Sequence, residues 1–300
     1  MAGVPADLYR PRGGDTETAL ILVHGLVEEG RRDARLVRAA RRLARSGFLV
    51  VVPDLLELRH GRLRYEDTEY VVQAIRLLRG PPVAVRRLAV VGISVGAAPA
   101  LFAAAETGDE VDLVLTLGAY AEAGALVQHL LSGGVDRELV RTFVLRNLDL
   151  FAAASDRWVL ADALARSLDA LEDPGLERRL SPAGRAVARL LTRRTPPDVA
   201  RALEALPEEV QAVLRALSPV RVAGSLRARL LLIHGAGDPA IPFTESRKLL
   251  AAAAPHTGAR LVRLRLLGHV DPEGGLFWNA APLTADVAAL WSAAYLLLSR

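Results

Sequence analysis

Short apolar runs rich in β-branched residues alternate, over the first 120 residues, with stretches in which apolar residues recur every three or four positions. This alternation is typical of βαβ units on a parallel sheet. Asp7–Arg10 can form one short edge strand. Beyond it, the pattern predicts strands at 19–23, 48–53, 88–91 and 111–117, and helices at 33–46, 68–78 and 97–105.

The pattern changes after residue 120, because no β-rich run appears between Ala121 and about Val222. Only helical segments punctuated by prolines occur there, and loop-closure entropy tolerates an insertion of this size. Strands are predicted again at 230–233 and 260–266, and helices at 244–254 and 284–299. The sequence thus predicts a core domain (1–120 and 222–300) and an inserted helical cap (121–221). A unit inserted there would lie above the carboxyl ends of the strands, where open α/β sheets bind ligands.

Composition narrows the class of protein. An apolar content of 51% is enough for a large core, so disorder is not expected. The net charge of +4 comes mainly from arginines in short runs with acids between them, and no nucleic-acid recognition motif accompanies it. We therefore expect solvated helix faces and no nucleic-acid partner.

Several features bear on location and redox chemistry. The absence of cysteine excludes disulfides and thiolate ligands. Residues 1–15 lack the apolar core of a secretory signal, so a cytoplasmic protein is expected. Residues 88–105 carry no charge, but Gly92, Gly96 and Pro99 interrupt them, which favours a buried strand, turn and helix over a membrane span. The sequence does not indicate an oligomeric state.

Ser94 lies in the sequence Gly92-Ile-Ser94-Val-Gly96, between a predicted strand and a predicted helix. This is the G-x-S-x-G pattern of a nucleophile elbow in its proper context. A serine on such a sharp turn needs small neighbours, and the N-terminus of the following helix favours a developing oxyanion. The alternative is a glycine-rich turn without chemistry.

His24-Gly25 directly follows the first strong strand. The chain must turn there, and the N–H of Leu26 is the candidate partner of the Val95 N–H in an oxyanion hole. For the imidazole of His24 we favour a structural role.

Asp238 and His269 each follow a later predicted strand. A buried carboxylate at Asp238 could orient an imidazole, although an aspartate in a Gly-Pro loop is often only a turn former. The order Ser94, Asp238, His269 is the order of the triad in α/β-hydrolases. Asp271 and Glu122 are competing candidates for the supporting roles in the triad. Asp54 and His60-Gly61 could line the mouth of the site, whereas His129 and His256 are expected to be structural or exposed.

With these motifs in place, residues 19–120 and 222–300 resemble the α/β-hydrolase superfamily. The resemblance implies an α/β fold with a mostly parallel sheet flanked by helices, and acyl transfer to water through an acyl-enzyme on Ser94. The chain departs from the family in its short segment before the first strong strand and in its long insertion. A serine nucleophile also argues against the epoxide hydrolase and haloalkane dehalogenase branches.

The expected function is that of a carboxylesterase acting on small or medium-chain esters, with an apolar small-molecule acyl substrate and no metal or organic cofactor. A peptidase, amidase or thioesterase with the same triad, or a non-catalytic binding protein of this fold, are the alternatives. Apolar residues of the insertion could face an acyl chain, but packing within the insertion is favoured. They are Leu126, Val127, Leu130, Leu131, Phe143, Leu148, Phe151, Trp158 and Leu160.

Overall fold

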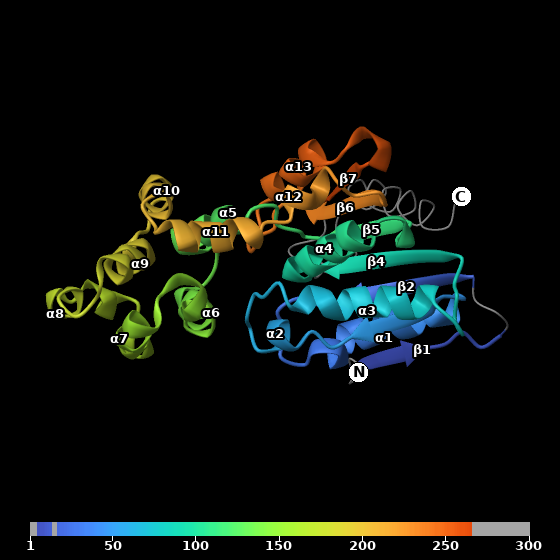
Figure 1. The fold of residues 1–300 in the computed structure, drawn as a ribbon, viewed down its shortest axis with the longest axis horizontal. Coiled ribbons are helices and arrows are strands. Elements are labelled where there is room, and N and C mark those ends of the chain that lie inside the picture. Colours follow the sequence, from blue (N-terminus) through green and yellow to red (C-terminus); the bar gives the residue numbers. More distant parts are fainter. Residues whose placement is uncertain (1–4, 14–16, 266–300) are drawn as a thin grey trace. The chain divides into compact units, whose positions relative to one another are not determined.

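A computed structural model describes residues 5–13 and 17–265 of the chain. The chain divides into two compact units (Figure 1). Within the described range, the core unit comprises the segments up to His60, Arg64–Ala121 and the chain from Pro219 onward. The helical unit comprises Glu122–Ser218 together with the short segment Gly61–Leu63.

The core unit is built on one sheet of seven strands in the order β1-β3-β2-β4-β5-β6-β7. All neighbouring strands pair in parallel except β1, which runs antiparallel to β3 at one edge. The strands are β1 Ala6–Tyr9, β2 Thr18–Val23, β3 Leu49–Pro53, β4 Arg87–Ile93, β5 Leu113–Leu117, β6 Arg229–Gly235 and β7 Arg260–Leu264. The strands predicted from apolar runs are therefore confirmed, including the edge strand at residues 7–10.

Helices connect these strands, as βαβ units require. The α-helices of the core unit are α1 Ala34–Arg45, α2 Leu56–Arg59, α3 Asp67–Arg79, α4 Ala97–Thr107, α12 Val220–Ala223 and α13 Phe243–Ala252. Single 3-10 turns are η1 Gly30–Arg32, η2 Ser94–Gly96, η3 Gly108–Glu110 and η6 Pro255–Thr257. The predicted helix at 284–299 lies outside the described residues.

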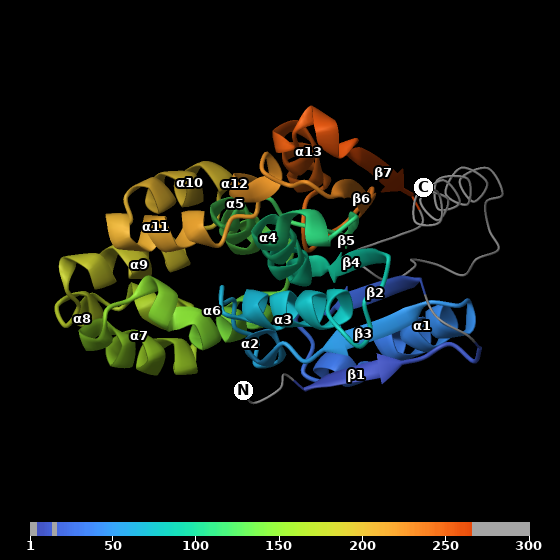
Figure 2. The ribbon, with the colours of Figure 1, turned by 45° about the vertical axis from the view of Figure 1, so that its right-hand side comes forward.

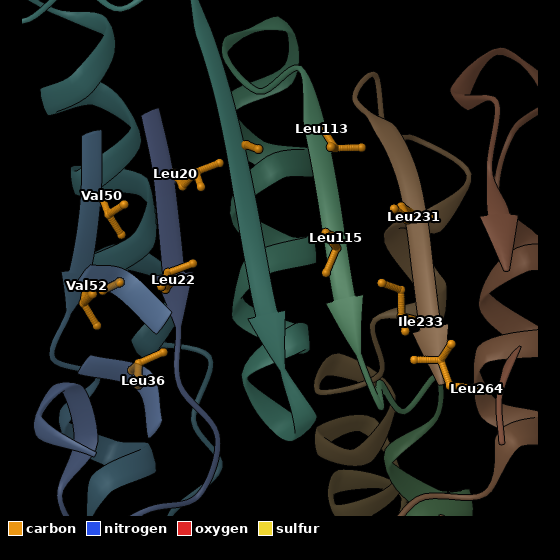
Figure 3. Packing of buried hydrophobic residues seen from close by; sticks show 12 residues of the cluster. Leu20, Leu22, Leu36, Val50, Val52, Leu113, Leu115, Leu231, Ile233 and Leu264 are labelled. Carbon is orange, nitrogen blue, oxygen red and sulfur yellow. The ribbon is translucent and has the colours of Figure 1, made fainter. Parts of the chain in front are cut away.

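Both faces of the sheet are buried. On one face, alternate residues of β2, β3, β5 and β6 belong to one buried apolar cluster, which also includes Leu36 and Ala40 of α1; Figure 3 shows Leu36 on the side of this cluster where Leu22 and Val52 lie. The opposite face is covered by α4 and α13, since Gly92 of β4 lies against Ala97 of α4 and His234 of β6 bonds to Ser246 of α13. This arrangement explains why the strands read as continuous apolar runs rather than as alternating ones.

The helical unit contains no strand among its described residues. Its helices are α5 Ala123–His129, α6 Arg137–Phe151, α7 Ala154–Arg166, α8 Pro174–Glu177, α9 Pro182–Thr192, α10 Pro196–Glu204 and α11 Glu208–Ala216 (Figure 2). A π-turn, η4 Leu130–Gly134, and a 3-10 turn, η5 Asp169–Glu172, complete it. The prolines stand at helix starts: Pro174, Pro182 and Pro196 open α8, α9 and α10, where a missing N–H costs nothing.

The insertion leaves and rejoins the core chain at neighbouring points. In the core unit, the Val220 N–H donates to the Ala121 carbonyl at 3.0 Å. In the helical unit, the Ala123 N–H donates to Ser218 Oγ at 2.9 Å. The two crossing segments therefore run side by side, as expected of an insertion whose ends are close.

A second connection was not predicted from the sequence. The fully buried amide of Asn147 on α6 accepts from the Leu63 N–H and donates to the Gly61 carbonyl, each at 2.8 Å. These bonds hold Gly61–Leu63, a part of the loop between α2 and α3, within the helical unit. The division at 120 and 222 predicted from the strand pattern omits this segment.

Candidate active site

Ser94 lies on a strained turn between β4 and α4. Its φ of 54° is in the left-handed region, which a non-glycine residue occupies only at a cost. It opens the single 3-10 turn η2, directly before α4. A serine held this way at a strand-to-helix turn is the local geometry of a nucleophile elbow.

The two glycines of the motif are required because neither position has room for a Cβ atom. An ideal Cβ at Gly92 would stand 2.5 Å from Ala97 Cα of α4, and one at Gly96 would overlap the carbonyl oxygen of His24. Real Cβ atoms do not approach so closely. The sequence G-x-S-x-G is therefore explained by packing of the turn against α4 on one side and against the chain after β2 on the other.

The loop after β2 lies against the elbow. A Cβ at Gly25 would stand 3.2 Å from Ser94 Cβ and 3.7 Å from Ser94 Oγ, so the Gly25 backbone closely approaches the serine. Leu26 follows it and is 37% exposed. Val95 is the second residue of η2. The first N–H groups of a helical turn have no acceptor within that turn, so the Val95 N–H makes no hydrogen bond inside η2. Val95 thus follows Ser94 directly in the chain, and Leu26 follows the glycine whose backbone closely approaches Ser94.

The imidazole of His24 has a structural role, as predicted. It is 2% exposed, and its Nδ1 lies 2.8 Å from the Gly25 carbonyl oxygen, so Nδ1 carries the proton. Its Nε2 accepts from the Leu55 N–H at 3.1 Å. Burial lowers the pKa of His24, which favours this neutral tautomer.

Asp67 completes the support of the loop that carries α2. This buried carboxylate accepts from the N–H groups of Glu57 (3.2 Å) and Leu58 (2.9 Å), in the first turn of α2. We expect Asp67→Ala to lower the free energy of unfolding by about 1–3 kcal/mol, because two N–H groups lose their acceptor. Urea denaturation measures this loss. The exposed neighbour Glu66, which caps nothing through its side chain, provides the control Glu66→Ala, with a change near zero.

The difference in unfolding free energy between wild type and Asp67→Ala should depend on pH. Burial raises the pKa of Asp67 from 3.8 to about 6, against the effect of its two N–H donors. Because the folded protein binds this proton more tightly, the contribution of the group is full below its ordinary pKa and is lost as pH rises through about 6. The stability difference between wild type and Asp67→Ala should therefore be larger at low pH than at neutral pH. An unchanged or opposite trend would contradict this assignment.

Asp238 follows β6, which lies two strands away from β4 in the sheet. Because these strands run parallel, Asp238 and Ser94 both follow the carboxyl ends of their strands. Its side chain is fully buried. Oδ1 accepts from the N–H groups of Ala240 and Ile241, each at 2.9 Å, so Asp238 does form a turn. Oδ2 lies 3.3 Å from His234 Nε2. The turn fixes the carboxylate, and forming it does not exhaust the acceptor capacity of the two oxygens.

His234 and Ser246 support Asp238 and were assigned no role from the sequence. His234 is fully buried, and its Nε2 faces two acceptors, the Ile241 carbonyl oxygen at 2.8 Å and Asp238 Oδ2. Its Nδ1 lies 2.7 Å from Ser246 Oγ. In the neutral imidazole Nδ1 therefore accepts a hydrogen bond from the Ser246 hydroxyl. The signal in the sequence was a polar residue, Ser246, at a buried position of a helix.

Some of the remaining candidate site residues lie within the described part of the chain and some lie outside it. His269 and Asp271 lie outside the described residues. Asp54, buried after β3, pairs with Arg59 at 2.8 Å and Arg31 at 3.4 Å, so it is part of an ion-pair cluster. Glu122 lies in the helical unit at the start of α5, and His60 follows α2.

The two other histidines are also placed. His129 ends α5, and His256 Nε2 lies 2.7 Å from the Leu226 carbonyl oxygen. Among the described residues, no cluster of three or more histidine, aspartate or glutamate side chains could hold a metal ion. Within the same part of the chain, every helix is too short or too polar to cross a bilayer.

Comparison with solved structures identifies the fold. Est1E from Butyrivibrio proteoclasticus is similar, with a TM-score of 0.52 and 14% identity over 96% of this chain and 94% of that chain. Proline iminopeptidase from Mycobacterium smegmatis is similar, with a TM-score of 0.50 and 16% identity over 99% of both chains. Acylaminoacyl peptidase from Pyrococcus horikoshii has a TM-score of 0.54 and 15% identity over 97% of this chain, which spans 39% of that protein.

No protein-family model matches the sequence, and no curated protein matches it in a sequence search. The structural likeness, together with the mostly parallel seven-stranded sheet, nevertheless establishes the architecture. The chain has the α/β-hydrolase fold.

Proposed function

We propose that the chain is a serine hydrolase that cleaves carboxylic esters through an acyl-enzyme on Ser94. The observation that carries this proposal is the strained φ of Ser94 on a turn whose glycines are required by packing. Strain of this kind persists where the surrounding structure enforces it, which is typical of active sites. The proposal of a hydrolase also draws support from the two peptidases with the same fold.

In the proposed reaction, His269 accepts the proton of the Ser94 hydroxyl while Oγ attacks the ester carbonyl carbon. The N–H groups of Leu26 and Val95 bind the oxyanion, and Asp238 orients the imidazole and stabilises its charged form. His269 then gives its proton to the leaving alcohol. In the second half, His269 activates water, which releases the acid and restores Ser94.

We further propose an apolar acyl substrate. The helical unit contains a small pocket lined only by apolar side chains: Val127, Leu130, Leu131, Val140, Phe143, Val144, Phe151, Leu190 and Leu191. Most apolar residues of the insertion are buried within the unit, whereas Trp158 is 84% exposed. Packing thus accounts for most of this apolar surface. The pocket, with a volume of about 10 Å³, has room for no more than one water molecule, so the proposal of an apolar substrate rests on the apolar composition of the insertion and not on this pocket.

The choice of substrate distinguishes the proposed esterase from the nearest alternative, a peptidase or amidase. Two of the similar structures are peptidases, and an amidase must protonate an amine rather than an alcohol. We expect p-nitrophenyl esters of short and medium chain to be cleaved much faster than aminoacyl p-nitroanilides. A preference for the anilides would show an amidase. Cleavage of neither, by folded protein, would favour a binding protein.

The hydroxyl of Ser246 gives a finer test. Ser246→Ala removes the donor to His234 Nδ1, and His234 contacts the Asp238 carboxylate. We expect kcat for ester cleavage to fall roughly fivefold with little change in KM, as for the loss of one buried hydrogen bond. The exposed Ser225 provides the control Ser225→Ala, with unchanged kinetics. An unchanged kcat in Ser246→Ala would remove His234 and Ser246 from the support of the triad.

A further inference from the structure

The outer side of α1 carries a set of exposed arginines on a helix that is fixed in place. Leu36, Ala40 and Ala44 bury the inner side of α1. Arg38, Arg41, Arg42 and Arg45 are exposed and lie three or four positions apart or adjacent, so they share one side of the helix. We call these four residues the α1 arginine face. It spans about 10 Å along the helix axis.

The charge of this face is not neutralised by the protein. Helix α1 contains no acidic residue, and within the described part of the chain the four arginines have no ion-pair partner. The neighbouring Arg35, in contrast, pairs with Asp33 at 2.9 Å. Helix α10 carries both signs, since Arg201 pairs with Asp198 at 2.6 Å.

The neighbouring edge strand β1 does not neutralise the charge of the α1 arginine face. Helix α1 contacts β1 and β3, so the arginine face lies at the edge of the sheet that β1 forms. Burial raises the pKa of Tyr9 on β1, and the charge of Arg41 opposes that rise. The acid of β1 that faces the region, Asp7, is already paired with Arg31. The sequence alone, with its arginines in short separated runs, did not reveal this concentration.

We propose that the α1 arginine face binds the surface of an anionic phospholipid bilayer. The planar guanidinium group donates two parallel hydrogen bonds to phosphate, so arginine suits this partner better than lysine. Lipid phosphates move laterally and can gather at any spacing of cations. Nucleic acid fits less well, because α1 lies flat against the sheet and offers arginine alone among the residue types that read base edges. The proposal does not depend on the chemistry of Ser94.

The test uses the full chain and sedimentation with vesicles of phosphatidylglycerol and phosphatidylcholine, beside vesicles of phosphatidylcholine alone. We expect binding to the anionic vesicles at about 0.1 M salt, loss of binding at about 0.5 M, and none to the neutral vesicles. The variant R38Q/R41Q/R42Q/R45Q keeps good helix formers and should lower the partition coefficient roughly tenfold or more. Its circular dichroism spectrum and thermal midpoint report whether it folds as the wild type does.

A matched control removes the same charge elsewhere. R157Q/R178Q/R179Q/R247Q changes four exposed arginines dispersed over α7, the segment after α8, and α13, and should keep the partition coefficient within roughly twofold. Equal losses in both variants would show an effect of net charge and overturn the proposal. So would a wild type that does not sediment with anionic vesicles, or one that binds a DNA duplex more tightly than vesicles at equal phosphate concentration and salt.

Discussion

Ser94→Ala should abolish ester hydrolysis, with kcat/KM lowered by roughly a thousandfold or more relative to wild type. The reason is chemical, since alanine at this position has no oxygen to form the acyl-enzyme. The protein should still fold, because the substitution leaves unchanged the close packing of Gly92 and Gly96 against their neighbours. Steady-state hydrolysis of a p-nitrophenyl ester measures the effect.

The matched control is Ser225→Ala. Ser225 is exposed and its hydroxyl bonds only to the Val222 carbonyl at 3.0 Å, so its loss should leave kcat/KM unchanged. Undiminished hydrolysis by Ser94→Ala would exclude Ser94 as the nucleophile, and with it the proposed mechanism.

Gly96→Ala should have the largest effect on stability. The new methyl group would overlap the His24 carbonyl oxygen and stand 2.8 Å from its carbonyl carbon and 3.0 Å from the Val23 carbonyl oxygen. These are backbone atoms, which cannot rotate away, so either the turn at Ser94 or the loop after β2 must shift. We expect a loss of about 2–4 kcal/mol in unfolding free energy, or no folded protein.

Activity reports the same displacement more sensitively. If Gly96→Ala folds, a shift of about 1 Å at Ser94 should lower kcat roughly a hundredfold. Gly124, in the first turn of α5, has no atom within 4 Å of an added Cβ and provides the control Gly124→Ala, with a stability change within about 1 kcal/mol. Wild-type stability and activity in Gly96→Ala would mean that the turn is not packed as described.

The sheet could be predicted from the sequence because its strands are buried on both faces. Continuous apolar runs such as Leu20–Val23 and Leu230–Ile233 have no other stable place in a protein of this size. The elbow was also predictable, since the need for small residues at 92 and 96 is local. Within the insertion, whose helix bounds the sequence analysis did not predict, the helices begin at prolines and at caps such as Asp136, whose side chain accepts from the Glu138 N–H.

What the sequence could not predict depends on contacts between distant residues. Asn147 holds Gly61–Leu63 across 84 residues, and an asparagine within a helical pattern gives no sign of such a partner. The chain from Ser246 through His234 to Asp238 likewise joins a helix to a loop. The π-turn at Leu130–Gly134 depends on Gly133, whose φ of 95° departs from helical values. His269, the predicted base, lies outside the described residues and stays a prediction.

The central claim, a nucleophilic Ser94, is tested most directly by labelling with a fluorophosphonate probe, which reacts with activated serines. Intact-mass spectrometry counts the adducts, and peptide mapping locates them. The account predicts one adduct per chain, on the peptide that contains Ser94, and none in folded Ser94→Ala. Folded wild-type protein that never labels, or an adduct that persists in Ser94→Ala, would contradict it.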